Sequence, residues 1–132
     1  MRLTGFLTAD ERSSLERLVS GIDLDAIRLG VLPDAVTRTM PTLGAITLGQ
    51  RILVRPGVFE DDREVLLDLL AHEVVHVAQW RRLGPAGFLV RYLIDYARLR
   101  VAGSGHAEAY LRIPAEEEAR DVAARRGDLR PG

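Results

Sequence analysis

The sequence predicts an α+β fold in which a small sheet packs on a buried central helix, with further helices around them. Residues 45–54 alternate in hydropathy around a two-residue turn, a pattern typical of a β-hairpin. Residues 65–71 are apolar nearly all round, as expected for a helix enclosed on every side. The 132 residues can bury one modest core, so we expect a single domain over residues 1–132.

Composition and charge exclude several classes of protein. The net charge of −1 gives no electrostatic case for binding nucleic acid. There is no cysteine, which excludes disulfides and a thiol nucleophile and fits a reducing cytosol. No apolar run is long enough for a signal peptide or a membrane span. We therefore expect a cytoplasmic protein, and export by a dedicated machine is left open.

The N-terminal part, residues 1–42, is expected to hold one helix and one strand. Thr8 and Glu11 have the spacing of a capping box, which predicts a helix over residues 9–20. Alternation within residues 22–31 predicts a short strand. The proline-bounded connection that follows has room for one turn of helix.

The hairpin opens the motif-bearing core, residues 43–126. Its strands are expected over residues 45–48 and 51–54, and Gly49 at the first turn position predicts a type II′ turn. Such a hairpin can simply shield the core. It can also offer a strand edge to an extended peptide substrate.

The central helix is expected to start after Asp61, with Glu64 completing a second capping box, and to end at about residue 82 before a Gly-Pro pair. A helix over residues 86–101 has apolar side chains at spacings of three and four, so we expect it to cover the core. A short helix or irregular segment over 106–114, a last helix over 115–126 and a frayed tail over 127–132 complete the chain.

The central helix carries the motif His72-Glu73-x-x-His76. Histidines four residues apart lie one turn apart on the same face of a helix and can share one zinc ion. Glu73 points beside that ion, where it can take a proton from a zinc-activated water. The motif predicts a zinc hydrolase, most simply a peptidase.

A catalytic zinc needs a third protein ligand. Spacing excludes a metzincin, because Arg82 stands where the third histidine would be. His106 is the only other histidine, and the alternative is a carboxylate from the acidic cluster Glu116, Glu117 and Glu118. Glu116 is favoured, because it shares a helix face with small residues that permit close approach to the central helix. Glu117 and Glu118 remain alternatives.

Three further residues are candidates for the site. His106 and Tyr110 can each donate a hydrogen bond to the tetrahedral oxyanion. His106 can instead be a fourth ligand, which would close the site and make it structural. Gln79 lies one turn beyond His76 and can bind either substrate or a neighbouring helix.

The run from Leu70 to Trp80, Arg91-Tyr92, Ala109-Tyr110 and Ile113-Pro114-x-Glu116-x-Glu118-Ala119 resembles a group of small bacterial zinc peptidase domains of unknown function. Some of these are attached to contractile injection systems and polymorphic toxins. The resemblance covers residues 43–123 and implies a zincin-like fold, zinc binding and a place in a larger assembly. More distantly, Glu-x-Glu-Ala is similar to the gluzincins, whose first glutamate is the ligand. Arg120 stands where that motif has aspartate.

The expected function is hydrolysis of peptide or protein substrates by zinc held by His72, His76 and Glu116. Two alternatives remain: a non-catalytic zinc-binding module in an assembly, and a latent peptidase held inactive by a partner, a dimer or its own tail.

Overall fold

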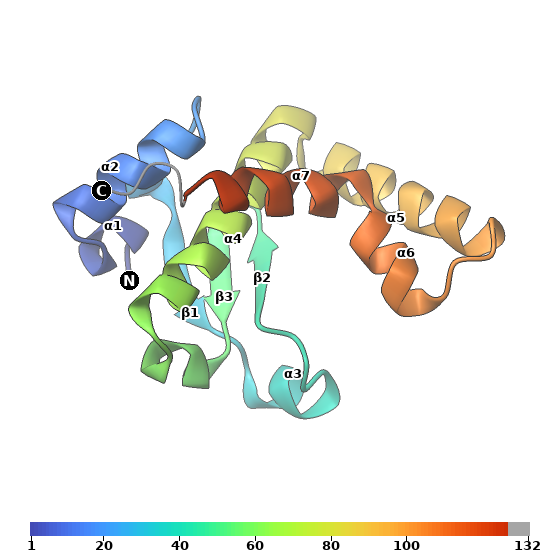
Figure 1. Cartoon of the computed structure of the whole chain (residues 1–132), viewed down its shortest axis with the longest axis horizontal. Coiled ribbons are helices and arrows are strands. Elements are labelled where there is room, and N and C mark those ends of the chain that lie inside the picture. The colour runs from blue at the N-terminus through green and yellow to red at the C-terminus, as the bar shows by residue number, and fades with distance from the viewer. Residues whose placement is uncertain (127–132) are drawn as a thin grey trace.

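The computed structural model describes residues 1–126, and the expected tail, 127–132, lies outside the described residues. The helices and strands are drawn in Figure 1. The helices are α1 (Leu3–Phe6), α2 (Ala9–Leu18), α3 (Asp34–Thr39), α4 (Arg63–Leu83), α5 (Pro85–Val101), α6 (His106–Arg112) and α7 (Pro114–Ala124), with 3-10 helices η1 (Leu24–Ala26) and η2 (Pro56–Glu60). The strands are β1 (Arg28–Val31), β2 (Ala45–Leu48) and β3 (Arg51–Val54). The α+β prediction is confirmed in a mostly helical chain. Within residues 1–126, none of the helices is both long and apolar enough to cross a membrane.

The three strands form one sheet in the order β1-β3-β2. β1 runs parallel to β3, and β2 and β3 form the predicted antiparallel hairpin. Gly49 has a φ of 63°, and Gln50 is not among the residues with positive φ, which is the combination that a type II′ turn requires. β2 therefore lies at an edge of the sheet, with its outer side unpaired among the described strands.

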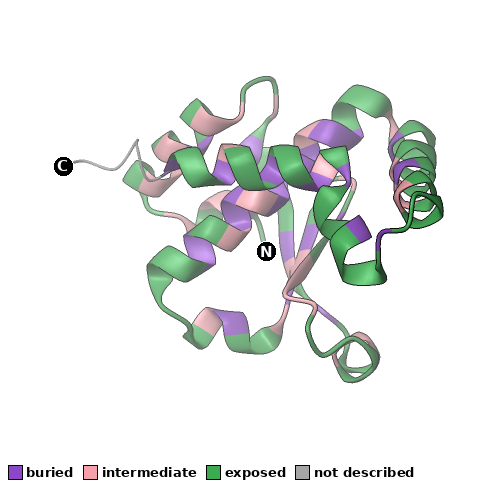
Figure 2. Ribbon diagram, turned by 45° about the vertical axis from the view of Figure 1, so that its right-hand side comes forward, coloured by how far each residue is buried: buried purple, intermediate pink, exposed green. Residues whose placement is uncertain are grey.

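The core lies between this sheet and α4. Leu70 and Val74 of α4 and Ile52 and Val54 of β3 are fully buried. α7 packs against α4 through small residues, since Ala119 is fully buried. Figure 2 shows this buried centre with exposed residues on the outer helices. This arrangement brings the end of the chain to the middle of the central helix.

The start of α4 corrects one prediction. Asp62, not Asp61, is the N-cap, and its side chain accepts a hydrogen bond from the Glu64 amide at 2.8 Å. The predicted capping box does not form, because η2 continues to Glu60 and Asp61 closes it with a bond to the carbonyl of Val58. The chain therefore enters α4 one residue later than the sequence pattern suggested. The short helix α1 was not predicted.

A second correction concerns α5, which does not cover the core. Only Phe88 and Asp95 are buried along its length, while Leu89, Val90 and Leu93 are 48%, 55% and 63% exposed. Gly84 ends α4 with a φ of 75°, and Pro85 starts α5 at once, so the chain turns sharply away. α5 and α6 project from the rest of the molecule on the right of Figure 1. α7 takes the place against α4 that α5 was expected to fill.

The predicted capping box of α2 is present, and its Glu11 also ties α2 to α4. Its carboxylate accepts hydrogen bonds from Arg63 at 2.9 and 2.5 Å, which, with the capping contacts, lower the pKa of Glu11 to about 2. A depressed pKa means that this carboxylate stabilises the fold above pH 4.5, its ordinary pKa, and that the stabilisation is lost as the pH falls toward 2.

We expect Glu11→Gln to lower the free energy of unfolding at pH 7 by about 1–2 kcal/mol, less than the full shift implies because Arg63 is partly in solvent. The variant should also lose less stability than the parent between pH 5 and 3, as measured by urea unfolding. Glu16→Gln is the matched control, because Glu16 pairs with Arg12 at the surface and should change little. Equal losses in the two variants would contradict the role of Glu11.

Candidate metal centre

The motif residues lie in the buried middle of α4. Glu73 and His76 are 6% and 5% exposed, and the side chain of His72 is 20% exposed. The two imidazole rings lie with centroids 4.9 Å apart, as expected one helical turn from each other. The two imidazoles therefore lie side by side on one face of α4, and that of His72 is the more exposed to solvent.

Glu116 of α7 completes the cluster. Its Oε2 lies 3.0 Å from Nε2 of His72, and its Oε1 lies 3.2 Å from Nε2 of His76. Two ligands of a tetrahedral zinc site, each about 2.0–2.1 Å from the ion, are about 3.3 Å apart. The ligand atoms of these three residues all lie within 4.8 Å of one another, so the group could hold a metal ion.

Gln79 fixes the orientation of His76. The side-chain nitrogen of Gln79 donates to the Ala115 carbonyl at 3.0 Å and to Oε1 of Glu118 at 2.9 Å. Its oxygen therefore faces Nδ1 of His76 at 2.8 Å, and this hydrogen-bond network assigns the proton to that nitrogen. In a neutral imidazole Nε2 is then an acceptor, and it faces Oε1 of Glu116, a second acceptor. Two acceptors at this distance require a cation between them, either a proton or a metal ion.

The electrostatics of the group keep Glu116 ionised. Burial on its own would raise the pKa of Glu116, but the hydrogen bonds and charges of His72 and His76 outweigh it and lower that pKa. Burial would likewise lower the pKa of His76, but its hydrogen bond to Glu116 and the Glu116 charge outweigh it and raise that pKa. A buried carboxylate that stays charged beside two imidazoles is suited to a cation.

Tyr92 of α5 is a member of the centre that the sequence pattern did not reveal. Its hydroxyl donates to Oε1 of Glu116 at 3.0 Å. Burial and the nearby charge of Glu116 raise the pKa of Tyr92 well above its usual range, so the hydroxyl stays protonated and acts as a donor. In the sequence it is among the residues of the family resemblance and lies on the amphipathic helix expected over residues 86–101, but no pattern assigned it a role in the site.

Thr47 of β2 is the second residue that was missed. Its hydroxyl donates to Oε2 of Glu73 at 2.7 Å and lies 3.2 Å from the Glu73 carbonyl. Glu73 is not part of the group of possible ligands among residues 1–126. The hairpin thus holds the carboxylate beside the metal centre, and the hydrogen bond leaves Oε1 of Glu73 for other partners.

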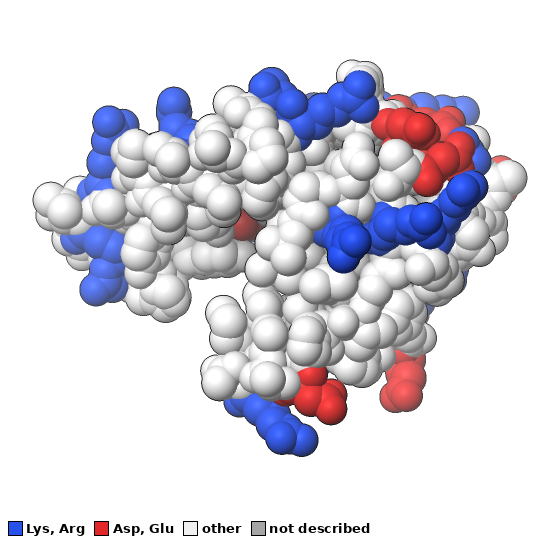
Figure 3. Space-filling view, turned by 180° about the vertical axis from the view of Figure 1, so that it is seen from behind, with Lys and Arg blue, Asp and Glu red and all other residues white. Residues whose placement is uncertain are grey.

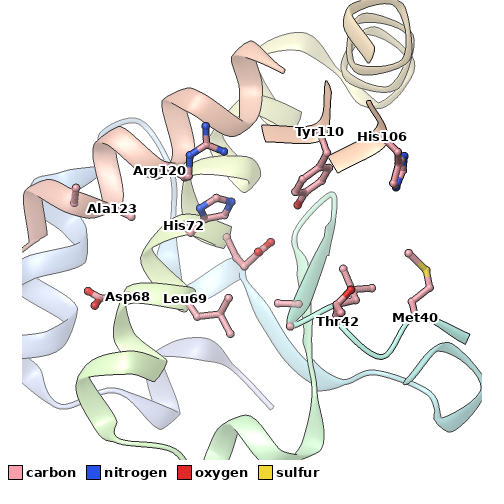
Figure 4. A pocket seen from close by; sticks show the side chains of 14 residues that line it. Met40, Thr42, Asp68, Leu69, His72, His106, Tyr110, Arg120 and Ala123 are labelled. Carbon is pink, nitrogen blue, oxygen red and sulfur yellow. The ribbon is translucent and has the colours of Figure 1, made fainter. Parts of the chain in front are cut away.

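A cleft with a volume of about 810 Å³ opens beside these residues. His72, Glu73 and Arg120 line it, and Figure 4 shows Tyr110 pointing into the same hollow from α6. Burial and the charges of Glu116 and Glu73 raise the pKa of Tyr110 to about 12, so it is a hydrogen-bond donor at neutral pH.

His106 also lines the cleft, but farther from the centre. Its Nδ1 is hydrogen-bonded to the hydroxyl of Tyr96 at 2.6 Å on the exposed side of α6. It is not part of the metal-ligand group found among the described residues. This geometry leaves the His72, His76 and Glu116 group without a fourth protein ligand from His106.

The other two glutamates of the acidic cluster lie away from the histidines. Glu117 is exposed, and Glu118 bonds to Gln79 and pairs with Arg82 at 3.6 Å. Arg120, which replaces the aspartate of the gluzincin motif, donates to the Leu111 carbonyl at the cleft wall. Gln79, and not the residue at position 120, contacts a histidine of the group.

We expect Gln79→Leu to weaken zinc binding by about 10- to 100-fold, because His76 loses the acceptor that sets its orientation. Gln79→Glu keeps an acceptor at this place and should recover part of the loss. Zinc affinity is measured by competition with a chelating dye. Arg82→Ala is the control, since Arg82 contacts Glu118 but not a histidine. An unchanged affinity in Gln79→Leu would rule out this positioning role.

Comparison with known proteins gives one finding. No curated protein and no solved structure matches the chain. A family model, that of the eCIS core domain, matches residues 7–84, more than half of the chain. The match includes the hairpin and α4 and ends before α5, so Glu116 lies beyond it. The link to contractile injection systems that the sequence resemblance implied is thereby confirmed. The chain belongs to the eCIS core domain family.

Proposed function

We propose that the protein is a zinc-dependent metallopeptidase with a zincin-like arrangement of its edge strand, motif helix and ligand helix. One observation carries the proposal: His72 and His76 of α4 converge with Glu116 of α7, while Glu73 lies next to them and outside the ligand group. A structural metal site would have no use for a buried carboxylate in that position.

The donor set fits zinc. Two imidazoles and one carboxylate are ligands that zinc takes in catalytic sites, where three protein ligands leave one position open. Bound zinc would lower the pKa of a water molecule in that position and polarise a substrate carbonyl. His72, His76 and Glu116 would hold the ion. Gln79 would orient His76, and Tyr92 would orient Glu116.

The remaining steps belong to the residues of the chain. Glu73, positioned by Thr47, accepts the proton of the attacking water at its free oxygen and passes it to the leaving amine. Tyr110 donates a hydrogen bond to the oxyanion that forms on the carbonyl. The unpaired edge of β2 binds the substrate as an extended chain, which makes peptides and proteins the substrate class.

The proposal is tested by incubating the protein with a complex peptide mixture and identifying new termini by mass spectrometry. We expect cleavage by the zinc-loaded protein, loss of cleavage with a chelator and recovery when zinc is returned. Cleavage that survives complete removal of metal would overturn the proposal, and so would a zinc-loaded, folded protein that cleaves nothing.

A second candidate is a zinc-binding module without activity, or a latent peptidase, within a larger assembly. Membership of a family linked to contractile injection systems favours it, as do the exposed apolar side chains of α5. Activity that appears only after a partner is removed would identify the latent form. Permanent inactivity with bound zinc would identify the module.

A further inference from the structure

We propose that the protein cleaves its substrate next to a large apolar residue, and that a second hollow beside the metal centre accepts this side chain. The inference rests on the proposed peptidase function and names the class of substrate. It assigns the selection to β2 and α5, two elements that provide none of the metal ligands.

The second hollow has a volume of about 450 Å³, within the usual range of ligand pockets. Glu73, His76 and Glu116 line it, so it reaches the metal centre itself. Its walls come from β2, α4 and the start of α5, with contributions from α3, from the connection between α3 and β2, and from Tyr110 of α6. The apolar residues on which the argument depends are Ile46, Leu48, Trp80, Phe88 and Leu89. Among its described lining residues there is no lysine or arginine, and the only carboxylates are those of the centre.

The rim of this hollow exposes apolar surface that the protein does not cover. Leu48 of β2 and Leu89 of α5 both line the hollow and are each 48% exposed, and Ile46 is 37% exposed. Beneath them the wall is buried and firm, since Trp80 stacks on Phe88 with ring centroids 4.8 Å apart. An apolar side chain that entered here would remove both its own surface and this rim from water.

The first cleft differs in the charges that it carries. Asp68, His106 and Arg120 line it, next to apolar residues such as Leu69. Glu73 and Tyr110 line both hollows, so the proposed general base stands between a cleft that has charged side chains of its own and a hollow whose only charged side chains belong to the centre. All four residues of β2 border the apolar hollow. A chain paired with that edge therefore places a side chain next to the scissile bond in the apolar hollow.

The surface around the second hollow also has few charged side chains. Figure 3 shows the molecule hollowed between the projecting α5–α6 part and the rest, with uncharged side chains over most of the projecting part. The arginines of α5 lie away from the hollow and do not line it. A basic or acidic side chain would find no opposite charge there apart from the centre, whereas a leucine or phenylalanine would be enclosed.

The experiment uses two zinc chelators that differ in one side chain, leucine hydroxamate and serine hydroxamate. Their dissociation constants for the zinc-loaded full chain are measured by calorimetry. We expect leucine hydroxamate to bind about 10- to 100-fold tighter, the usual effect of burying one leucine side chain. In the peptide-mixture assay, large apolar residues should be enriched on one side of the cleaved bonds.

The decisive variant is Leu48→Ser combined with Leu89→Ser, which removes apolar surface from both walls. The preference for leucine hydroxamate should fall below about threefold while zinc content stays unchanged. The matched control combines Leu93→Ser and Val101→Ser, two exposed positions of α5 that do not line the hollow, and it should keep the preference. If the double variant does not fold, the two single variants are measured in the same way.

The outcomes separate this inference from the function on which it rests. Equal affinity for the two hydroxamates, or an undiminished preference in the folded double variant, overturns the apolar site. Zinc-dependent cleavage without apolar enrichment does the same and leaves the peptidase proposal standing. Failure of the protein to bind zinc or either hydroxamate overturns both.

Discussion

Glu73→Gln is expected to abolish hydrolysis while the protein keeps its zinc. The amide has nearly the same shape and can still meet the hydroxyl of Thr47, but it cannot accept a proton from water. Removing a general base of this kind costs about 10²- to 10⁴-fold in rate. The measurement is kcat/KM on a peptide substrate, together with zinc content and affinity for the same preparation.

Two further variants locate the effect. Asp68→Asn changes another acidic residue of α4 that lines the same cleft, and it should keep most of the activity. Thr47→Val leaves Glu73 in place but removes its hydrogen bond, so we expect an intermediate loss of kcat of about 10-fold. Hydrolysis retained by Glu73→Gln would show that Glu73 is not the general base.

Glu116→Gln is expected to lower zinc affinity by more than 100-fold, a larger loss than the removal of a residue that only orients a ligand. The variant loses the negative charge whose oxygen atoms lie 3.0 Å from Nε2 of His72 and 3.2 Å from Nε2 of His76. Zinc affinity by dye competition and residual activity at saturating zinc give two independent readings of the loss.

Glu117→Gln is the matched control, because it removes the same charge from the next, exposed position of α7. Its zinc affinity should match that of the parent protein. Glu118→Gln should have a small effect, acting through its contact with Gln79. A loss in Glu117→Gln as large as that in Glu116→Gln would show that α7 presents a different face to the histidines.

The position of Glu116 could be anticipated because its evidence is local. Glu116, Ala119 and Ala123 share one helix face, and small residues at such spacing indicate close packing against another helix. In the structure this face lies against α4, with Ala119 fully buried and Glu116 4% exposed. The hairpin, its turn and the extent of α4 rest on equally local patterns, of hydropathy and of turn residues, and were predicted well.

Thr47 and Tyr92 could not be anticipated, because their roles depend on contacts between distant segments. Thr47 is an ordinary strand residue until β2 lies beside α4, 26 residues later in the sequence. Tyr92 contacts the site only because α5 and α7 lie close enough for its hydroxyl to reach Glu116, 24 residues later in the sequence. The wrong prediction that α5 covers the core has the same cause. The spacing of its apolar residues indicates a helix with an apolar face, but the turn at Gly84 decides what that face packs against.

The position of Glu116 on α7 determines when the candidate metal group can assemble during folding. His72 and Glu116 are 44 residues apart in sequence, and they meet only when the last described helix has docked on the middle of the chain. A ribosome must therefore have synthesised α7 before the three possible ligands can come together. We expect a zinc ion held by these three residues to link α7 to α4 and to stabilise the docked position of α7. Adding a chelator should make the segment after α5 the first to be cut in limited proteolysis.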